Sequence, residues 1–135
     1  MCVFCDIVHN DIPTNKIYED DNVIAILDAN PVSLGHTLII TKRHYENILV
    51  SDEKTNQSIT KAIQLIGNSI LRTYGKGINV VSNINECAGQ SVMHAHIHLI
   101  PVDENDNKLK VEYNSIGKID TDKITEDIKN NIKQK

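Results

Sequence analysis

Three histidines at alternate positions constrain this chain more than any other feature of its sequence. The segment reads Met93-His94-Ala95-His96-Ile97-His98-Leu99-Ile100. Alternation with a period of two predicts a half-buried β-strand, with the histidines on one face and the apolar residues on the other. The Cα atoms of His94 and His98 are then about 13 Å apart, too far for one metal ion with His ligands at about 2.0–2.1 Å. The row of imidazoles suits the lining of a groove, although a polar strand face that happens to carry histidine is the plain alternative.

The remaining pattern predicts an α+β fold with an antiparallel sheet of about five strands. Apolar and β-branched runs, separated by turn-forming residues, predict strands over 16–19, 23–27, 36–41, 78–82 and 93–100. Helices are expected over residues 2–10, from a Ser51 cap to about Tyr74, and from an Asp120 or Thr121 cap onward with Ile124, Ile128 and Ile132 on one face.

The long helix has two faces of different character. Ile59, Ile63, Ile66 and Ile70 follow helical spacing and are expected to pack on the sheet. A milder second face consists of Ala62, Leu65, Ser69 and Arg72. This face either meets a second copy of the chain or simply faces water.

Composition limits the possible functions and locations. A length of 135 residues is that of a single domain, and the net charge of -4 gives no basic surface for nucleic acid. The sequence has no apolar run long enough to span a membrane and no leader, so a cytoplasmic location is expected. Three cysteines without a secretion signal do not predict a disulfide framework. Cys2-Val3-Phe4-Cys5 by itself is therefore a metal-binding, redox or incidental pair.

The stretch Gly89-Gln90-Ser91-Val92-Met93-His94-Ala95-His96-Ile97-His98-Leu99-Ile100-Pro101 closely resembles the motif of the histidine triad family. Further segments resemble family positions in the same order, and they are Val3-Phe4-Cys5-Asp6-Ile7, Ile12-Pro13, Tyr18-Glu19-Asp20, Leu27-Asp28, Pro31, Gly35-His36-Thr37-Leu38-Ile39-Ile40 and Lys42-Arg43-His44. The resemblance implies a histidine triad domain over residues 1–105. Residues 106–135 are then a C-terminal extension whose helix packs on or next to the domain.

The resemblance also implies the roles of the site residues. His96 is expected to be the nucleophile, since a neutral imidazole nitrogen can attack phosphorus and form a labile intermediate. His98 is expected to touch the phosphate and assist proton movement, while Ser91 binds its oxygens and His36 supports the other rings. Asp28 falls at the family's ribose position, and Asn83 and Gln90 are expected against the phosphate. Phe4, Ile7 and Leu27 are expected to line the base slot, although each would pass equally well as core.

A metal site follows from the same resemblance. Cys2, Cys5, His44 and His94 together would form a closed tetrahedral zinc site of the structural kind. Some bacterial members and the related galactose-phosphate uridylyltransferases look alike in using such a set. No catalytic metal is expected.

The leading hypothesis is a nucleotide hydrolase or transferase acting at the α-phosphate of a purine nucleoside phosphoramidate through a nucleotidyl-histidine. A dinucleoside polyphosphate hydrolase is the alternative within the enzyme class. A nucleotide-binding or scaffold protein with incidental activity, and a zinc-binding protein, are alternatives of other classes. The resemblance also implies a homodimer paired through the long helix and its neighbouring strand.

Overall fold

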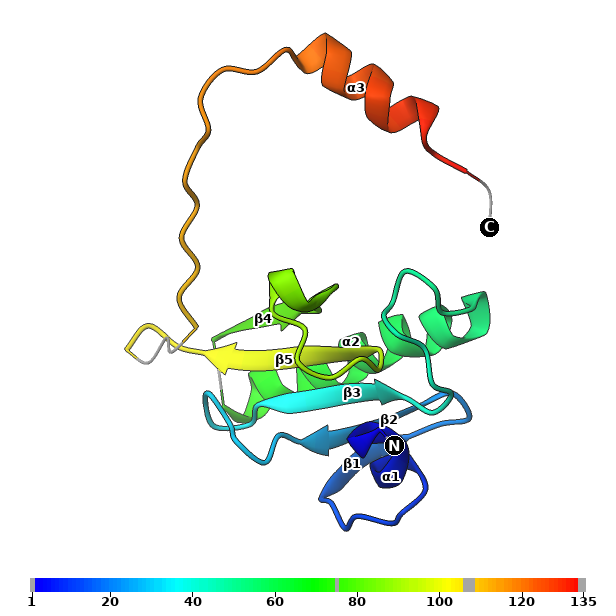
Figure 1. Ribbon diagram of the computed structural model, residues 1–135. Helices are drawn as coiled ribbons and strands as arrows, with labels where there is room; N and C mark the ends of the chain where they lie inside the picture. Colours follow the sequence, from blue (N-terminus) through cyan, green and yellow to red (C-terminus); the bar gives the residue numbers. More distant parts are fainter. Residues whose placement is uncertain (1, 75, 106–108, 134–135) are drawn as a thin grey trace.

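The computed structural model describes residues 2–74, 76–105 and 109–133. Five strands form one antiparallel sheet in the order β1-β2-β3-β5-β4, as Figure 1 shows. The strands are β1 Lys16–Glu19, β2 Val23–Leu27, β3 Thr37–Thr41, β4 Gly77–Val81 and β5 His96–Val102. The helices are α1 Val3–Val8, α2 Glu53–Thr73 and α3 Thr121–Asn130, with a short 3-10 turn, η1, at Glu86–Ala88. The predicted α+β class with an antiparallel sheet, a long helix and a C-terminal helix is confirmed.

The two faces of the sheet carry different layers. Alternate side chains of a strand point to opposite faces, so Ile97 and Leu99 of β5 lie with Ile39 against α2. On the opposite face, α1 packs Phe4 and Ile7 on β2 and β3 residues such as Ile40. His96 and His98 alternate with Ile97 and Leu99, and they therefore lie on the α1 face.

β5 begins at His96, three residues later than the predicted start at Met93. The residues before it bond to loops instead of to a strand, because the amide of His94 donates to the carbonyl of Val92 and that of Ala95 to the carbonyl of Tyr45. His94 is thus not the first member of a regular row, and its ring is free to turn away from those of His96 and His98.

Two expectations for α2 are corrected. The cap is Asp52 instead of Ser51, because its side chain accepts a hydrogen bond from the amide of Thr55 at 2.8 Å. Ala62, expected on the milder second face, is fully buried in the core, whereas Ile63 is only partly buried. The small side chain allows α2 to lie close to the sheet at this point.

The C-terminal segment, residues 109–133, lies apart from the sheet (Figure 1). In Figure 1, residues 109–120 run away from the sheet on the side of β4 and lead to α3. α3 has the predicted Asp120 cap and no buried residue. The division into residues 1–105 and 106–135 stays a prediction, and residues 106–108 lie outside the described residues.

Candidate active site and metal cluster

A cavity of about 760 Å³ opens on the α1 face of the sheet, beside β5. Its apolar wall comes from α1 and β2, and its polar wall from β5 and two loops. Many of the residues expected at the site line it, and these are Phe4, Ile7, Leu27, Asp28, Ser91, His96 and His98. The cavity therefore joins an apolar slot to a pair of imidazoles.

The backbone sets the proton position on His96. Its Nδ1 lies 2.6 Å from the carbonyl oxygen of His94, and since a carbonyl only accepts, Nδ1 must carry the hydrogen. The remaining nitrogen, Nε2, then has a free lone pair. The ring of Phe4 lies edge-on to this imidazole, with centroids 4.8 Å apart, and restricts its rotation. His96 is thus an oriented, neutral imidazole on the cavity wall.

A second backbone group sets the proton positions on His36 and His98. The amide of Val32 donates to Nδ1 of His36 at 3.0 Å, so the hydrogen of that ring is on Nε2. Nε2 of His36 lies 2.9 Å from Nδ1 of His98 and donates to it. His98 therefore carries its own hydrogen on Nε2. This chain of bonds leaves one donor, the Nε2–H of His98, on the cavity wall next to the lone pair of His96.

Asp28 lies at the end of β2 where the chain turns toward Pro31. Its Oδ1 accepts from the amide of Asn30 at 2.8 Å, while its Oδ2 is 3.5 Å from Nε2 of His36. Since the single hydrogen of that nitrogen is already directed to His98 at the shorter distance, Oδ2 remains available as an acceptor. A carboxylate at this position can accept hydrogen bonds from the two hydroxyls of a vicinal diol.

Burial keeps the rings neutral. It lowers the pKa of His36, of His96 and of His98, and the carboxylate of Asp28 only partly opposes this. For His98 the neighbouring His96 and His36 lower the pKa further. At neutral pH the lone pair of His96 is therefore not lost to protonation.

Two residues expected at the phosphate hold the loop before β5. Gln90 is buried, its Oε1 accepts from the amide of Asn85, and its Nε2 donates to the carbonyls of Glu46 and Val92. Nδ2 of the Asn83 side chain donates to the carbonyl of Ala88 at 2.8 Å. Neither is among the described residues that line the cavity. In this arrangement both shape the turn that carries Ser91.

The four residues expected at the metal come together behind the cavity. Nδ1 of His94 lies 3.3 Å from Sγ of Cys2, 3.5 Å from Sγ of Cys5 and 3.1 Å from Nδ1 of His44. The fourth contact joins Sγ of Cys5 to Nδ1 of His44 at 3.3 Å. All four ligand atoms lie within 4.8 Å of one another, so the group could hold a metal ion.

The donor set fits zinc. Tetrahedral zinc places two nitrogens about 3.3 Å apart and a nitrogen and a sulfur about 3.6 Å apart, close to the separations found. Nε2 of His94 donates to the carbonyl of Thr41 at 2.7 Å, which leaves the Nδ1 lone pair directed at the cluster. Burial, followed by the proximity of Cys2, raises the pKa of the Cys5 thiol, and a bound cation would reverse that shift.

Comparison with known families identifies the domain. The model of the HIT domain, the histidine triad domain, matches residues 9–105. The chain belongs to the HIT family. Members of this family are generally nucleotide hydrolases or transferases.

Relatives in other organisms extend over most of the chain. A HIT-like protein of Borreliella burgdorferi is 43 % identical over 122 residues, which is 82 % of this chain and 87 % of that protein. The adenylylsulfatase HINT3 of Arabidopsis thaliana is 41 % identical over 106 residues, covering 78 % of this chain and 54 % of that protein.

Solved HIT structures are also similar. A HIT protein of Bacillus subtilis matches with a TM-score of 0.91 and 33 % identity over 99 % of both chains. One from Bacillus anthracis gives the same score and identity over 98 % of this chain and 97 % of that one. A zinc-bound histidine triad protein of Mycobacterium smegmatis gives 0.75 with 33 % identity over 84 % of each chain.

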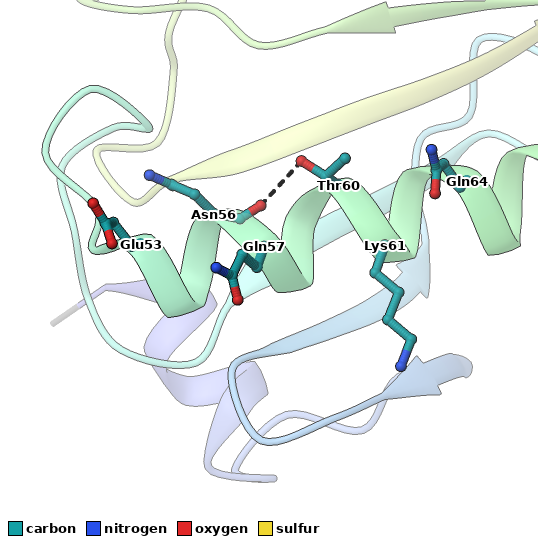
Figure 2. A pocket seen from close by; sticks show the side chains of 6 residues that line it. All are labelled: Glu53, Asn56, Gln57, Thr60, Lys61 and Gln64. Carbon is teal, nitrogen blue, oxygen red and sulfur yellow. Dashed lines mark hydrogen bonds between the residues drawn. The ribbon is translucent and has the colours of Figure 1, made fainter.

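A second hollow, of about 510 Å³, lies along α2 (Figure 2). Its lining residues are all polar and come from one helix, and they are Glu53, Asn56, Gln57, Thr60, Lys61 and Gln64. It contains no imidazole or thiol, so it offers no activated nucleophile. The cavity beside β5, which contains two imidazoles, is the better candidate for an active site.

Sequence reasoning missed the backbone groups that orient the rings. The amide of Val32 and the carbonyls of Thr41 and His94 each set one imidazole tautomer. Because each such residue has an amide and a carbonyl whatever its side chain, no sequence pattern could have marked these three.

In the part of the chain that the structure describes, no helix is long and apolar enough to cross a membrane.

Proposed function

We propose that this HIT protein cleaves a purine nucleoside phosphoramidate at its α-phosphate through a covalent intermediate on His96. The observation that carries the proposal is the bond from Nδ1–H of His96 to the carbonyl of His94 at 2.6 Å, which leaves Nε2 as a nucleophile on the cavity wall. Phe4, Ile7 and Leu27 are proposed to hold the base and Asp28 the ribose hydroxyls.

The reaction has two displacements. In the first, the lone pair of His96 Nε2 forms a bond to phosphorus, and the leaving nitrogen departs with its bonding pair and takes up a proton. The carbonyl of His94 stabilises the positive charge on the substituted ring, because a hydrogen bond from a charged donor is stronger than one from a neutral donor. In the second, water attacks phosphorus, loses a proton and returns the bonding pair to Nε2.

His98 and Ser91 are proposed to bind the phosphoryl group. Nε2–H of His98 can donate to a phosphoryl oxygen or to the leaving atom as negative charge develops there. Ser91 is exposed on the rim of the same cavity and supplies a hydroxyl. His36 acts through His98 and not on the substrate. The side-chain amides of Asn83 and Gln90 donate to the carbonyls of Ala88 and Glu46. Direct contacts from the two residues to the phosphate stay predictions.

A sulfate leaving group is a second candidate, favoured by the identity of 41 % to the adenylylsulfatase of Arabidopsis thaliana. The same lone pair would attack the α-phosphorus of adenylyl sulfate, and sulfate would leave without needing a proton. The test is the release of AMP from adenosine phosphoramidate, adenylyl sulfate and a diadenosine polyphosphate, measured side by side. Fastest release from the phosphoramidate supports the proposal. Binding of AMP without turnover of any of the three would support a nucleotide-binding protein instead.

We further propose that Cys2, Cys5, His44 and His94 hold a structural zinc ion. Four protein ligands leave no open position for water, so the metal would stabilise the fold and orient His94 without activating a nucleophile. Through its carbonyl, the same residue orients His96.

A symmetric homodimer paired through β4 and α2 is also proposed. β4 is an edge strand of the sheet, and Val80 on it is 52 % exposed. An apolar groove of about 470 Å³ runs between β4 and α2, with Ile59, Ile63 and Val80 among its lining residues. Sedimentation that gives a mass near the 15.1 kDa of one chain, instead of twice that, would exclude this dimer.

A further inference from the structure

The pair Cys2 and Cys5 has a geometry that suits a disulfide as well as a metal ion. Cys2 is the N-cap residue of α1 and Cys5 the third residue of that helix. The carbonyl of Cys2 already accepts a helical hydrogen bond from the amide of Asp6 at 3.1 Å. Residues three apart in a helix have Cα atoms about 5 Å apart, within the range of about 4.4–6.8 Å that a disulfide spans. The pair can therefore close a disulfide without unwinding α1.

The sulfur of Cys5 lies on the side of the cluster that faces solvent. It contacts Nδ1 of the exposed His44 at 3.3 Å as well as Nδ1 of the buried His94 at 3.5 Å. The sulfur of Cys2 contacts buried His94 at 3.3 Å. Both cysteines are partly exposed and free. A small oxidant arriving from water therefore meets Cys5 first, with Cys2 beside it as a second thiol.

We propose that Cys2 and Cys5 are a peroxide-sensitive modification site, at which oxidation to a disulfide releases the metal of the cluster and lowers turnover in the neighbouring cavity. This rests on the zinc site and the hydrolysis proposed above. Zinc is bound by thiolates, and a disulfide has none. The imidazoles of His44 and His94 that remain are half of a tetrahedral ligand set, so the ion leaves.

One molecule of hydrogen peroxide balances the oxidation. The sulfur of Cys5 attacks one peroxide oxygen, the O–O bond breaks, and the departing hydroxide takes a proton from solvent and becomes water. The sulfur of Cys2 then attacks the sulfenic acid formed on Cys5. The S–S bond forms, the S–O bond breaks, and a second hydroxide is protonated to water. The two sulfurs lose two electrons and the peroxide gains them, while zinc departs as the divalent ion.

The cluster and the cavity share structural elements. Phe4 lies between the two cysteines in the sequence, and its ring centroid is 5.9 Å from that of His94 and 4.8 Å from that of His96. The carbonyl of His94 also accepts the hydrogen of His96 Nδ1. Loss of the metal frees α1, which carries Phe4, and removes one restraint on His94. Both changes reach His96.

The disulfide does not replace the stabilisation that the metal gives. It closes a loop of four residues, Cys2 to Cys5, and the stabilisation by a disulfide grows with loop length. The metal instead joins Cys5 to His44 and His94, which follow 39 and 89 residues later. We therefore expect the oxidised protein to have a lower Tm than the zinc-bound protein, although it has gained a covalent bond.

Titration of the Cys87→Ser protein with hydrogen peroxide tests the site. This replacement removes the exposed thiol outside the cluster. Zinc release is followed with a colorimetric chelator, the disulfide by peptide mass spectrometry, and kcat by release of AMP from adenosine phosphoramidate. We expect one zinc ion and one Cys2–Cys5 disulfide per chain to appear together, and kcat to fall about tenfold. A phosphine reductant with added zinc should reverse all three changes.

Cys2→Ser in the same background separates the roles of the two sulfurs. Without its partner thiol, the sulfenic acid on Cys5 should persist long enough to be labelled by a dimedone-type probe, and no internal disulfide should form. Absence of label on Cys5 would overturn the assignment of Cys5 as the first thiol to react. The titration of the Cys87→Ser protein decides the disulfide and the zinc release whether or not this variant folds.

The outcomes separate this proposal from those on which it rests. Bound zinc with both thiols still reduced, or sulfinic acid without a disulfide, would overturn the modification site. A disulfide with unchanged kcat would overturn its coupling to the cavity. Protein that takes up no zinc before oxidation overturns the zinc site and the release of metal, but not disulfide formation. Absence of turnover before oxidation overturns the proposed hydrolysis alone.

Discussion

At the scale of single residues, the chemistry proposed for this HIT domain depends on which nitrogen of each imidazole carries the hydrogen. Three main-chain groups decide this, namely the carbonyl of His94 for His96, the carbonyl of Thr41 for His94, and the amide of Val32 for His36 and, through it, His98. The result is one lone pair and one N–H donor side by side on β5. A displacement at phosphorus uses such a pair, because one group attacks while the other neutralises the developing charge.

Replacing His96 with alanine should abolish turnover and leave nucleotide binding nearly intact. The change removes the nucleophile, while the proposed base and ribose contacts remain, so kcat is expected to fall at least about 10³-fold. Single-turnover AMP release and calorimetric AMP binding check the two halves of this prediction. His9→Ala is the control, since His9 is exposed at the end of α1 and lies outside the cavity. A variant that retained kcat near the wild-type value would refute the assignment of His96.

Replacing Val32 with proline should lower kcat about 10- to 100-fold with little change in KM. Proline has no amide hydrogen, so His36 can turn its proton to Nδ1 and no longer donates to His98. Nitrogen-15 chemical shifts of the imidazoles report the tautomers directly, and Val32→Ala, which keeps the amide, should behave as wild type. Unchanged tautomers and unchanged kcat in the proline variant would contradict the assignment of this role to Val32.

At the scale of elements, the metal cluster joins three separate parts of the chain. Cys2 and Cys5 flank the start of α1, His44 follows β3, and His94 precedes β5. α1 has only six residues and no side-chain cap, so its own helical stability is small. A metal at this point would fix α1, and with it the Phe4 ring that restricts His96.

Purified protein should therefore contain one zinc ion per chain, and chelation should lower Tm by more than about 5 °C. Part of the folding free energy is coupled to metal binding, and α1 would loosen when the ion leaves. Elemental analysis and thermal melts with and without chelator measure this. Cys5→Ser should reproduce the loss, while Cys87→Ser should not, because Cys87 is exposed in η1 outside the cluster. Absence of zinc even after reconstitution would leave the cysteine pair incidental.

At the scale of the whole molecule, folding stability should decrease in acid because the histidines are buried. An unfolded histidine has a pKa near 6.5, and burial lowers the pKa of His36 and of His98 in the folded chain. As pH falls below about 6.5, the unfolded chain takes up protons that the folded chain does not, so the free energy of unfolding decreases down to the lower, folded pKa. Above about 6.5 both states are neutral at these rings, and their contribution is fully retained.

Denaturant unfolding between pH 5 and 8 tests this on wild type and on His36→Gln/His98→Gln. Each ring contributes at most about 1.4 kcal/mol per pH unit, so the double variant should show a shallower dependence in this window. The zinc ligands are the same in both proteins, and acid release of the metal therefore cancels in the comparison. Identical slopes would show that these two rings do not titrate differently in the folded and unfolded chains.

The order and type of the elements could be read from the sequence. Runs bounded by turn-forming residues predicted the bounds of β1 and β2. The triad predicted a strand with His96 and His98 opposite Ile97 and Leu99, because alternation of side chains is a property of any extended chain. Helical spacing likewise predicted α2 and α3. The resemblance to HIT proteins assigned Cys2, Cys5, His44 and His94 to one cluster, although they lie far apart along the chain.

Only the tertiary structure decided how the imidazole rings of the site are oriented and where the C-terminal helix α3 lies. The carbonyl that fixes His94 belongs to Thr41, far away in the sequence, and the start of β5 at His96 depends on a bond between Ala95 and Tyr45. The side-chain amide of Gln90 bonds to Asn85 in its own turn and to the carbonyl of Glu46, which lies far away in the sequence. The isoleucine spacing predicted α3, but that none of its residues is buried came only from the structure. The carbonyls of Thr41, Tyr45 and Glu46 are backbone groups distant in the chain, and such partners leave no pattern in the local sequence.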